Sequence, residues 1–147
     1  MKQENQHPPL TISVNDYDRL AWIATAGVHN RRDLDAAGLL ATELTRATIV
    51  SAQAIPPSVA TMHSRVEFRD DLTDAVHRMT LVYPGEEAPE KGRHSVLTPV
   101  GAALIGLSEG QSIRWRTPKG GWRSLTLLRV IYQPERMAPL GAYPAAM

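Results

Sequence analysis

The double proline Pro56-Pro57 divides this chain into two parts with different hydrophobic periodicity. Proline lacks a backbone N–H and has a fixed φ, so a helix cannot run through the pair. Before it, apolar residues recur at steps of three and four, the spacing of a helix face. After it, apolar and polar residues alternate, the spacing of a half-buried strand. Helices followed by strands predict an α+β fold.

Two amphipathic helices are expected before the double proline. The first carries its apolar face between Leu20 and Gly27. Asn15 or Asp16 is expected as its N-cap, and Gly27 as its C-terminal stop. A polar connector of about five residues then leads to Asp33, which can cap the second helix. A connection this short predicts an antiparallel helical hairpin.

Short strands and one short helix are expected after the double proline. We expect strands at Val66–Phe68, Met79–Tyr83, Ser95–Leu97, Gln111–Thr117 and Trp122–Gln133. Pro99 is expected to start a helix that extends through Leu104. This order predicts a twisted, mostly antiparallel sheet with one short helix laid on it. The expected organisation is a disordered tail at 1–9, the hairpin at 10–53, the sheet domain at 54–136 and a flexible tail at 137–147.

Composition excludes several classes of function. The chain of 147 residues has no cysteine, so disulfides, thiolate metal sites and cysteine nucleophiles are absent. Its five histidines are not paired at the i, i+3 or i, i+4 spacing of a metal-binding helix face. No apolar run approaches the roughly 20 residues of a membrane helix, and no secretory signal is evident. We expect a cytoplasmic protein without metal, cofactor or catalytic residues.

Two charged groups each allow two interpretations. Asp33 and Asp35, beside Arg31 and Arg32, could hold Mg²⁺ near a phosphate or simply start a helix, where acids are favoured. The basic residues in the last third of the chain could face a polyanion or an acidic partner, or could form a solvated face of the sheet. These basic residues are Arg114, Arg116, Lys119, Arg123, Arg129 and Arg136. Alternation places Arg114 and Arg116 on one strand face, with Trp115 on the other.

One long motif carries a family resemblance. The stretch Ser95–Ser112, with Thr80–Pro84 before it and Tyr132–Glu135 after it, resembles the Rnk ("regulator of nucleoside diphosphate kinase") family. It is similar also to the C-terminal domains of the Gre-type transcript-cleavage factors. The resemblance implies an FKBP-like, GreA/GreB C-terminal-like domain at 54–136 and a short antiparallel coiled coil before it.

The resemblance also implies a function. A protein of this kind is expected to bind core RNA polymerase at the rim of the secondary channel, as a monomer, and to compete with Gre-type factors. It is expected to bind no nucleic acid sequence-specifically and no membrane. The implied docking residues are Thr98, Pro99, Val100, Gly101, Leu107, Ser108 and Glu109.

Transcript cleavage is not expected from this chain. In Gre-type factors the acids at the tip of the helical hairpin are three residues apart in sequence, whereas Asp33 and Asp35 are two residues apart. An arm of about 16 residues also reaches only about 25 Å. The alternatives are a cleavage factor that uses these two acids, or a prolyl isomerase, which would need an apolar, aromatic-lined cleft. Direct control of a nucleoside diphosphate kinase, suggested by the family's name, has no support in the residues.

Overall fold

The computed structural model describes residues 8–28 and 34–137 of the chain. Its helices are α1 (Val14–Val28), α2 (Leu34–Thr45), α3 (Pro99–Leu104) and α4 (Pro134–Met137), with short 3₁₀ turns η3 (Ala52–Ala54) and η4 (Pro89–Lys91). Its strands are β1 (Thr11–Ser13), β2 (Thr48–Val50), β3 (Arg65–Asp70), β4 (Val76–Val82), β5 (Arg93–Ser95), β6 (Ser112–Arg116) and β7 (Trp122–Tyr132). The predicted mixture of helices and sheet is confirmed.

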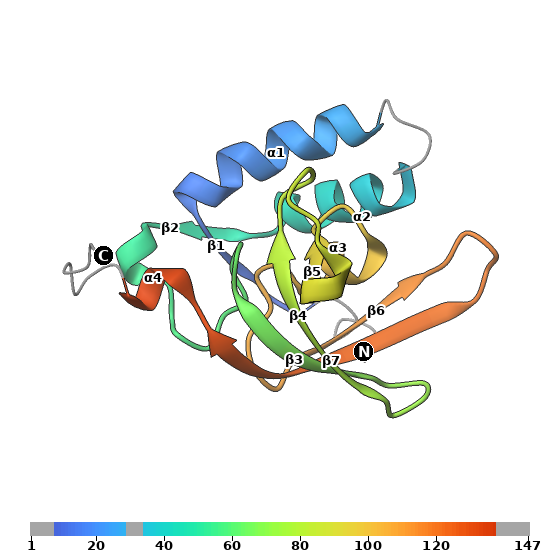
Figure 1. Ribbon diagram of the computed structural model, residues 1–147. Helices are drawn as coiled ribbons and strands as arrows, with labels where there is room; N and C mark the ends of the chain where they lie inside the picture. Colours follow the sequence, from blue (N-terminus) through green and yellow to red (C-terminus); the bar gives the residue numbers. More distant parts are fainter. Residues whose placement is uncertain (1–7, 29–33, 138–147) are drawn as a thin grey trace.

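The main sheet has the strand order β5-β4-β3-β7-β6. All neighbours in it are antiparallel except β4 and β5, and β3 is bulged against β7. Figure 1 shows the sheet curling beneath the helices, with α3 between α2 and the strands. The β6–β7 hairpin extends beyond the rest of the sheet.

The first helix starts earlier than its sequence predicted. Ser13 Oγ accepts a hydrogen bond from the Asp16 backbone N–H at 3.2 Å, so Ser13 is the N-cap. The prediction of Asn15 or Asp16 as the cap was therefore wrong. The helix also continues through Gly27 to Val28. Gly27 is buried against α2, and its role is close packing of two helices rather than a stop.

β2 pairs in parallel with β1 to form a small second sheet, and β1 lies within the β-prone run Leu10–Val14 of the sequence. One predicted strand is displaced. The strand predicted at Ser95–Leu97 lies instead at Arg93–Ser95. The chain turns after Ser95, because Ser95 Oγ accepts from the Leu97 N–H and the Ser95 carbonyl accepts from the Thr98 hydroxyl.

One hydrophobic core spans both halves of the chain. Leu20 of α1 and Leu40 of α2 belong to the same buried cluster as Leu81, Leu104 and Leu127. α1 packs against α2, and α2 packs against α3. The antiparallel helix pair therefore lies on the sheet part of the molecule instead of standing away from it (Figure 1). The coiled-coil and FKBP-like descriptions stay predictions.

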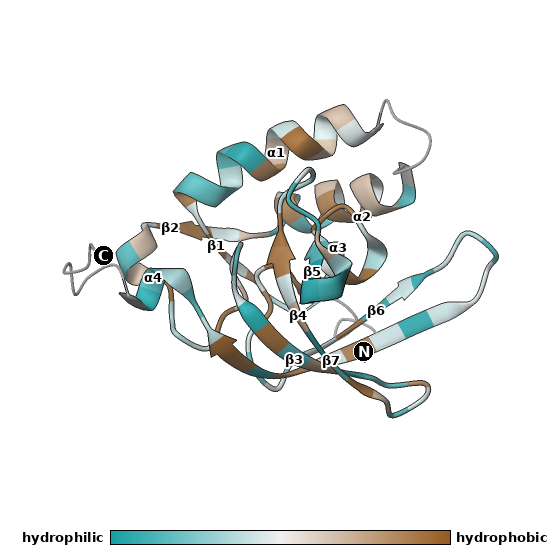
Figure 2. Cartoon of the chain, viewed as in Figure 1, coloured by the Kyte–Doolittle hydropathy of each residue, from teal (hydrophilic) through white to brown (hydrophobic). Residues whose placement is uncertain are grey.

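The hydropathy of the strands differs between the centre of the molecule, where the end of β4 is buried, and the hairpin end. Figure 2 shows the end of β4 as apolar, where it runs towards the helices, and the outer part of β6 as hydrophilic. Strand β6 alternates strictly between exposed and buried residues, so one face of it belongs to the core and the other to solvent.

A polar contact fixes α1 to the loop after β4. The Tyr83 hydroxyl donates to Asp16 Oδ1 at 3.1 Å, and the Arg19 guanidinium lies 3.8 Å from the centre of the Tyr83 ring. Burial raises the pKa of Asp16, and the bond from Tyr83 opposes that rise. Burial and the neighbouring Asp16 carboxyl raise the pKa of Tyr83, so the phenol remains protonated and donates.

Substitution of two helical glycines should have opposite effects on stability. In Gly27→Ala the new Cβ would lie 2.8 Å from Ala37 Cβ, so the helices must move apart. We expect a loss of about 1–3 kcal/mol in the free energy of unfolding. Gly38→Ala is the matched control, because a Cβ there meets nothing within 4 Å. It should gain about 0.5–1 kcal/mol, since alanine is the better helix former. Urea unfolding of both variants measures the difference, and a stabilised Gly27→Ala would contradict the packing.

Tyr83→Phe should destabilise the protein in a pH-dependent way. Without the phenol donor, the half-buried Asp16 carboxylate loses a partner, at a cost of about 1–2 kcal/mol when it is ionised. The pKa of Asp16 is raised in the folded protein, so the deficit is full well above that pKa. It shrinks as the pH falls through that pKa, because a protonated carboxyl depends less on the donor.

The control for this prediction is Tyr132→Phe, because the exposed Tyr132 ring makes no side-chain hydrogen bond within the described residues. It should change the unfolding free energy by less than about 0.5 kcal/mol at any pH. Denaturant titrations from neutral pH downward compare the two variants. A Tyr83→Phe deficit that does not vary with pH would argue against the role of Asp16.

Candidate docking site

The start of α3 is fixed by a hydrogen-bonded cap. Thr98 Oγ1 accepts from the Gly101 N–H at 3.0 Å and donates to the Ser95 carbonyl at 2.8 Å. Pro99 occupies the first helical position, where its missing N–H costs no hydrogen bond. The helix bounds predicted from sequence, Pro99 to Leu104, are confirmed. The exposed Pro99 ring is therefore held at a defined place on the surface.

Gly101 shapes this loop from within. A Cβ at this position would lie 2.4 Å from the Ser95 carbonyl oxygen and 2.8 Å from Val96 Cα. Both atoms belong to the backbone, so neither can rotate away. Gly101 is buried and allows α3 to lie directly on the preceding segment, which makes it a shaping residue rather than a contact residue.

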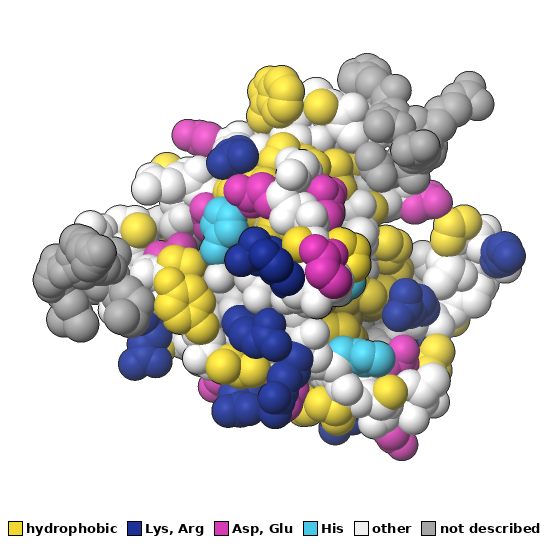
Figure 3. All heavy atoms as spheres, in the orientation of Figure 1, with side chains coloured by type: hydrophobic (Ala, Val, Ile, Leu, Met, Phe, Trp, Pro, Cys, Tyr) yellow, Lys and Arg dark blue, Asp and Glu magenta, His cyan; other side chains and the backbone are white. Residues whose placement is uncertain are grey.

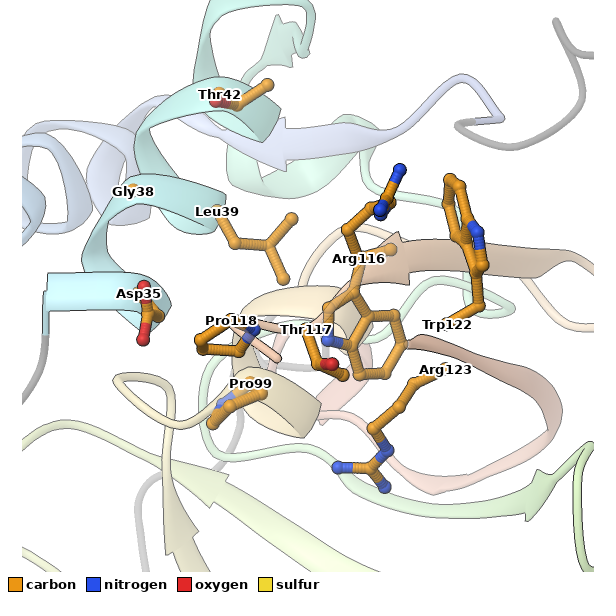
Figure 4. A pocket seen from close by; sticks show the side chains of 11 residues that line it. Asp35, Gly38, Leu39, Thr42, Pro99, Arg116, Thr117, Pro118, Trp122 and Arg123 are labelled. Atoms are coloured by element: carbon orange, nitrogen blue, oxygen red, sulfur yellow. The ribbon is translucent and has the colours of Figure 1, made fainter. Parts of the chain in front are cut away.

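A groove of about 450 Å³ lies between α2, the start of α3 and the β6–β7 hairpin. In Figure 4, Leu39 points from α2 towards the hairpin, and Asp35 and Pro99 lie together at the opposite side from Trp122. Its lining residues are Asp35, Gly38, Leu39, Thr42, Pro99, Trp115, Arg116, Thr117, Pro118, Trp122 and Arg123. We call it the α2 groove.

A second groove of about 370 Å³ lies on the sheet side of α3. Its lining residues are Phe68, Asp70, His77, Arg78, Met79, His94, Thr98, Pro99, Val100 and Arg123. The rings of Phe68 and His77 contact each other there, with their centres 5.3 Å apart and their planes tilted by 31°. We call it the sheet groove. Pro99 and Arg123 line both grooves, so the start of α3 forms the ridge between them.

The structure brings together only part of the residues singled out by sequence. Thr98, Pro99 and Val100 share the sheet groove. The segment Leu107–Glu109 follows the opposite end of α3 and lines neither groove. There the Leu107 side chain is 1% exposed, the Ser108 N–H donates to Gln111, and the Glu109 carboxylate accepts from the Val130 N–H. Of these three residues, Glu109 bonds the loop directly to β7.

The charged residues predicted at the tip of the helical hairpin are only partly within the described residues. Arg31, Arg32 and Asp33 lie outside the described residues. Asp35 is exposed on the first turn of α2 and lines the α2 groove. Within residues 8–28 and 34–137, no group of three His, Asp or Glu side chains is arranged to hold a metal ion.

The predicted alternation of β6 is confirmed. Arg114 and Arg116 are exposed, and Trp115 between them is 7% exposed. Leu39 of α2 and Phe68 of β3 also line the grooves and were not among the predicted site residues. No sequence signal could have found them, because each has the ordinary pattern of a helix or strand and meets α3 only in the folded chain.

Comparison with known proteins now defines the class. A family model described as "Transcription elongation factor, GreA/GreB, C-term" matches residues 55–132, and one described as "Rnk N-terminus" matches residues 8–50. A solved structure described as prokaryotic transcription elongation factor GreA/GreB from Nitrosomonas europaea is 35% identical with a TM-score of 0.64, covering 85% of this chain and 99% of that one. The molecule is therefore a protein with a GreA/GreB-type C-terminal domain preceded by a helix pair.

The full-length similarity is more specific. The "Regulator of nucleoside diphosphate kinase" of Escherichia coli (strain K12) is 41% identical over 131 residues, covering 85% of this chain and 92% of that protein. The transcription elongation factor GreA of Prosthecochloris aestuarii is 35% identical over 83 residues, 55% of this chain and 52% of that protein. The chain belongs to the Rnk family, as the resemblance in its sequence predicted.

A membrane-spanning role finds no support in the helices. Among the residues that the structure describes, none of the helices combines the length and the apolar composition needed to cross a bilayer.

Substitutions at Gly101 and Pro99 should distinguish a residue that shapes the loop from a residue that is free to contact a partner. Gly101→Ala places a Cβ against two backbone atoms and should lower the unfolding free energy by about 2 kcal/mol or more. Pro99→Ala leaves the Thr98 cap in place and should cost less than about 1 kcal/mol. Thermal and urea unfolding measure both changes. Equal losses in the two variants would show that Pro99 is a structural residue and not a surface ridge.

Proposed function

We propose that this protein regulates transcription by docking on RNA polymerase at the entrance of the secondary channel. The observation that carries the proposal is the GreA/GreB-type C-terminal domain, with its exposed Pro99 between two grooves. The proposed contact residues are Thr98, Pro99 and Val100, with Gly101 shaping their loop, and less directly Leu107, Ser108 and Glu109 at the other end of α3.

The two grooves suit a helical or loop segment of a large partner. Each is open and lined by a mixture of apolar surface and a few charged groups. Pro99 would enter between two elements of the partner, beside Arg123, which lines both grooves and pairs with Asp70 at 3.7 Å. This geometry favours recognition of a protein surface over binding of a small enclosed ligand.

In this proposal, the protein acts by occupying the entrance of the secondary channel. It would compete with Gre-type factors for the same entrance without cleaving RNA. Helix α1 has 15 residues and is therefore about 22 Å long, and the helix pair packs on the base of the molecule. The acids Asp33 and Asp35 would remain near the entrance instead of reaching a buried catalytic centre. The alternative, Gre-type cleavage by these two acids, is tested directly below.

Pro99→Arg should weaken binding to core RNA polymerase by at least about tenfold. The long charged side chain would project from the ridge between the grooves and obstruct the contact. The first helical turn tolerates arginine, so the fold should be kept. Pro89→Arg is the matched control, because Pro89 is also exposed and opens the 3₁₀ turn η4, outside both grooves. The measurement is a pull-down with titrated core polymerase, followed by competition with a GreA protein.

Three results would contradict the proposal: no association of the native protein with core polymerase, no competition with GreA, or equal weakening by the two arginine variants. Cleavage is examined with stalled elongation complexes. Release of short 3′ RNA fragments on addition of this protein alone, abolished in Asp33→Asn/Asp35→Asn, would establish the alternative.

A further inference from the structure

The outer face of the β6–β7 hairpin carries an ordered group of cations around one aromatic ring. Arg114 and Arg116 are exposed on β6, and Trp122 lies directly across from Arg116 on β7. The Arg114 guanidinium carbon lies 4.4 Å from the centre of the Trp122 ring, and that of Arg116 lies 5.3 Å from it. Lys119 follows in the turn that joins the strands. We call this group the hairpin cluster.

The charges of the hairpin cluster are not compensated by carboxylates within the described part of the chain. Elsewhere on the sheet, Arg69 pairs with Asp71, and both Arg78 and Arg129 pair with Glu67. No ion pair among the described residues involves Arg114 or Arg116. Figure 3 shows basic side chains over the projecting hairpin at the right of the view.

One carboxylate near the cluster, Asp71, is already engaged, and Asp35, which lines the α2 groove with Arg116 and Trp122, forms no ion pair with Arg116 among the described residues. Asp71 accepts hydrogen bonds from Ser124, which lies across from Arg114, and from Thr126, and it also pairs with Arg69. The chain as a whole has a formal net charge of only +1. The hairpin cluster is thus a local concentration of positive charge on a nearly neutral molecule, which is the pattern of a specific anionic partner rather than of bulk attraction.

Cation–π contact with Trp122 positions the two arginines for phosphate. A guanidinium that lies over an indole ring is held at its face, while its N–H groups point outward in its own plane. These in-plane donors match the paired oxygens of a phosphate group. Arg114 and Arg116 are two residues apart on a strand, so they are separated by about 6.8 Å along it. The cluster therefore presents a short row of phosphate-binding groups.

The exposed indole distinguishes the anions that could bind. Trp122 remains 38% exposed beside the two guanidinium groups. A nucleotide can place its phosphate on an arginine and its base against the indole, whereas a carboxylate side chain leaves the indole uncovered. We propose that the hairpin cluster binds the backbone of single-stranded nucleic acid without reading its sequence. Arg116 and Trp122 also line the α2 groove, so this site adjoins the proposed polymerase contact at Pro99, but the inference does not depend on that contact.

The test uses the full-length purified protein and a fluorescent 20-nucleotide oligo(dT) or oligo(U), without polymerase. Binding is followed by fluorescence anisotropy at several salt concentrations. Arg114→Glu/Arg116→Glu should weaken binding at least about tenfold, because two phosphate contacts are replaced by repulsion. The slope of log K against log salt should also become shallower by about one to two.

The matched control is Lys91→Glu/Arg136→Glu, with the same change of charge at exposed positions outside the hairpin. It should stay within about twofold of the native protein. A second variant, Arg114→Lys/Arg116→Lys, keeps the charge and loses the stacked planar donors. It should weaken binding a few-fold while the salt slope stays unchanged. Circular dichroism and thermal unfolding establish that all variants are folded.

The remaining outcomes overturn the inference. It fails if the native protein does not bind either oligonucleotide at low salt, or if the control variant loses as much affinity as the Arg114 and Arg116 variant. It fails also if an oligoglutamate of equal charge competes as well as the oligonucleotide does, since the site would then be one for acidic protein segments. Loss of oligonucleotide binding with intact polymerase binding would keep the two proposals distinct.

Discussion

The seating of α3 on the segment before it is the constraint on which the rest of the structure depends. Gly101 allows the helix to approach within contact distance of the Ser95 and Val96 backbone. Thr98 caps the helix at the same point, through bonds to Gly101 and Ser95. Seated in this way, α3 packs against α2 on one side and contributes buried residues to the sheet core on the other. Both grooves and the Pro99 ridge follow from this placement.

Local signals in the sequence predicted α3 and the β6–β7 hairpin well. Pro99 defines a helix start through its own covalent geometry, and the alternation of Arg114, Trp115 and Arg116 is a property of one strand. The same reasoning misplaced the cap of α1 and the role of Gly27. Several residues near a helix start can cap it, and the choice of Ser13 follows from the preceding strand β1. Gly27 is explained by Ala37 on another helix, a contact that no local pattern contains.

The candidate site was predictable only where one segment of chain makes it. The family motif pointed to Thr98–Val100, and these residues do line one groove together. The same motif also included Leu107, which the fold buries at the other end of α3. A motif is a stretch of sequence, and it mixes residues that shape a loop with residues that could meet a partner. The opposite walls of the grooves come from distant elements, so they required the structure.

The packing of the helix pair limits how this protein can act. Leu20, Leu40 and Leu44 are buried in the core that also holds Leu81 and Leu104. Lifting the helix pair away from the sheet would expose several large apolar side chains, each worth about 1.5–3 kcal/mol. That sum approaches the whole stability of a domain, about 5–15 kcal/mol. The helix pair therefore stays packed on the sheet part of the molecule, and a partner would contact helices and sheet as one rigid surface. Under the proposed function, a rigid body of this kind would act at the channel entrance by occupying it.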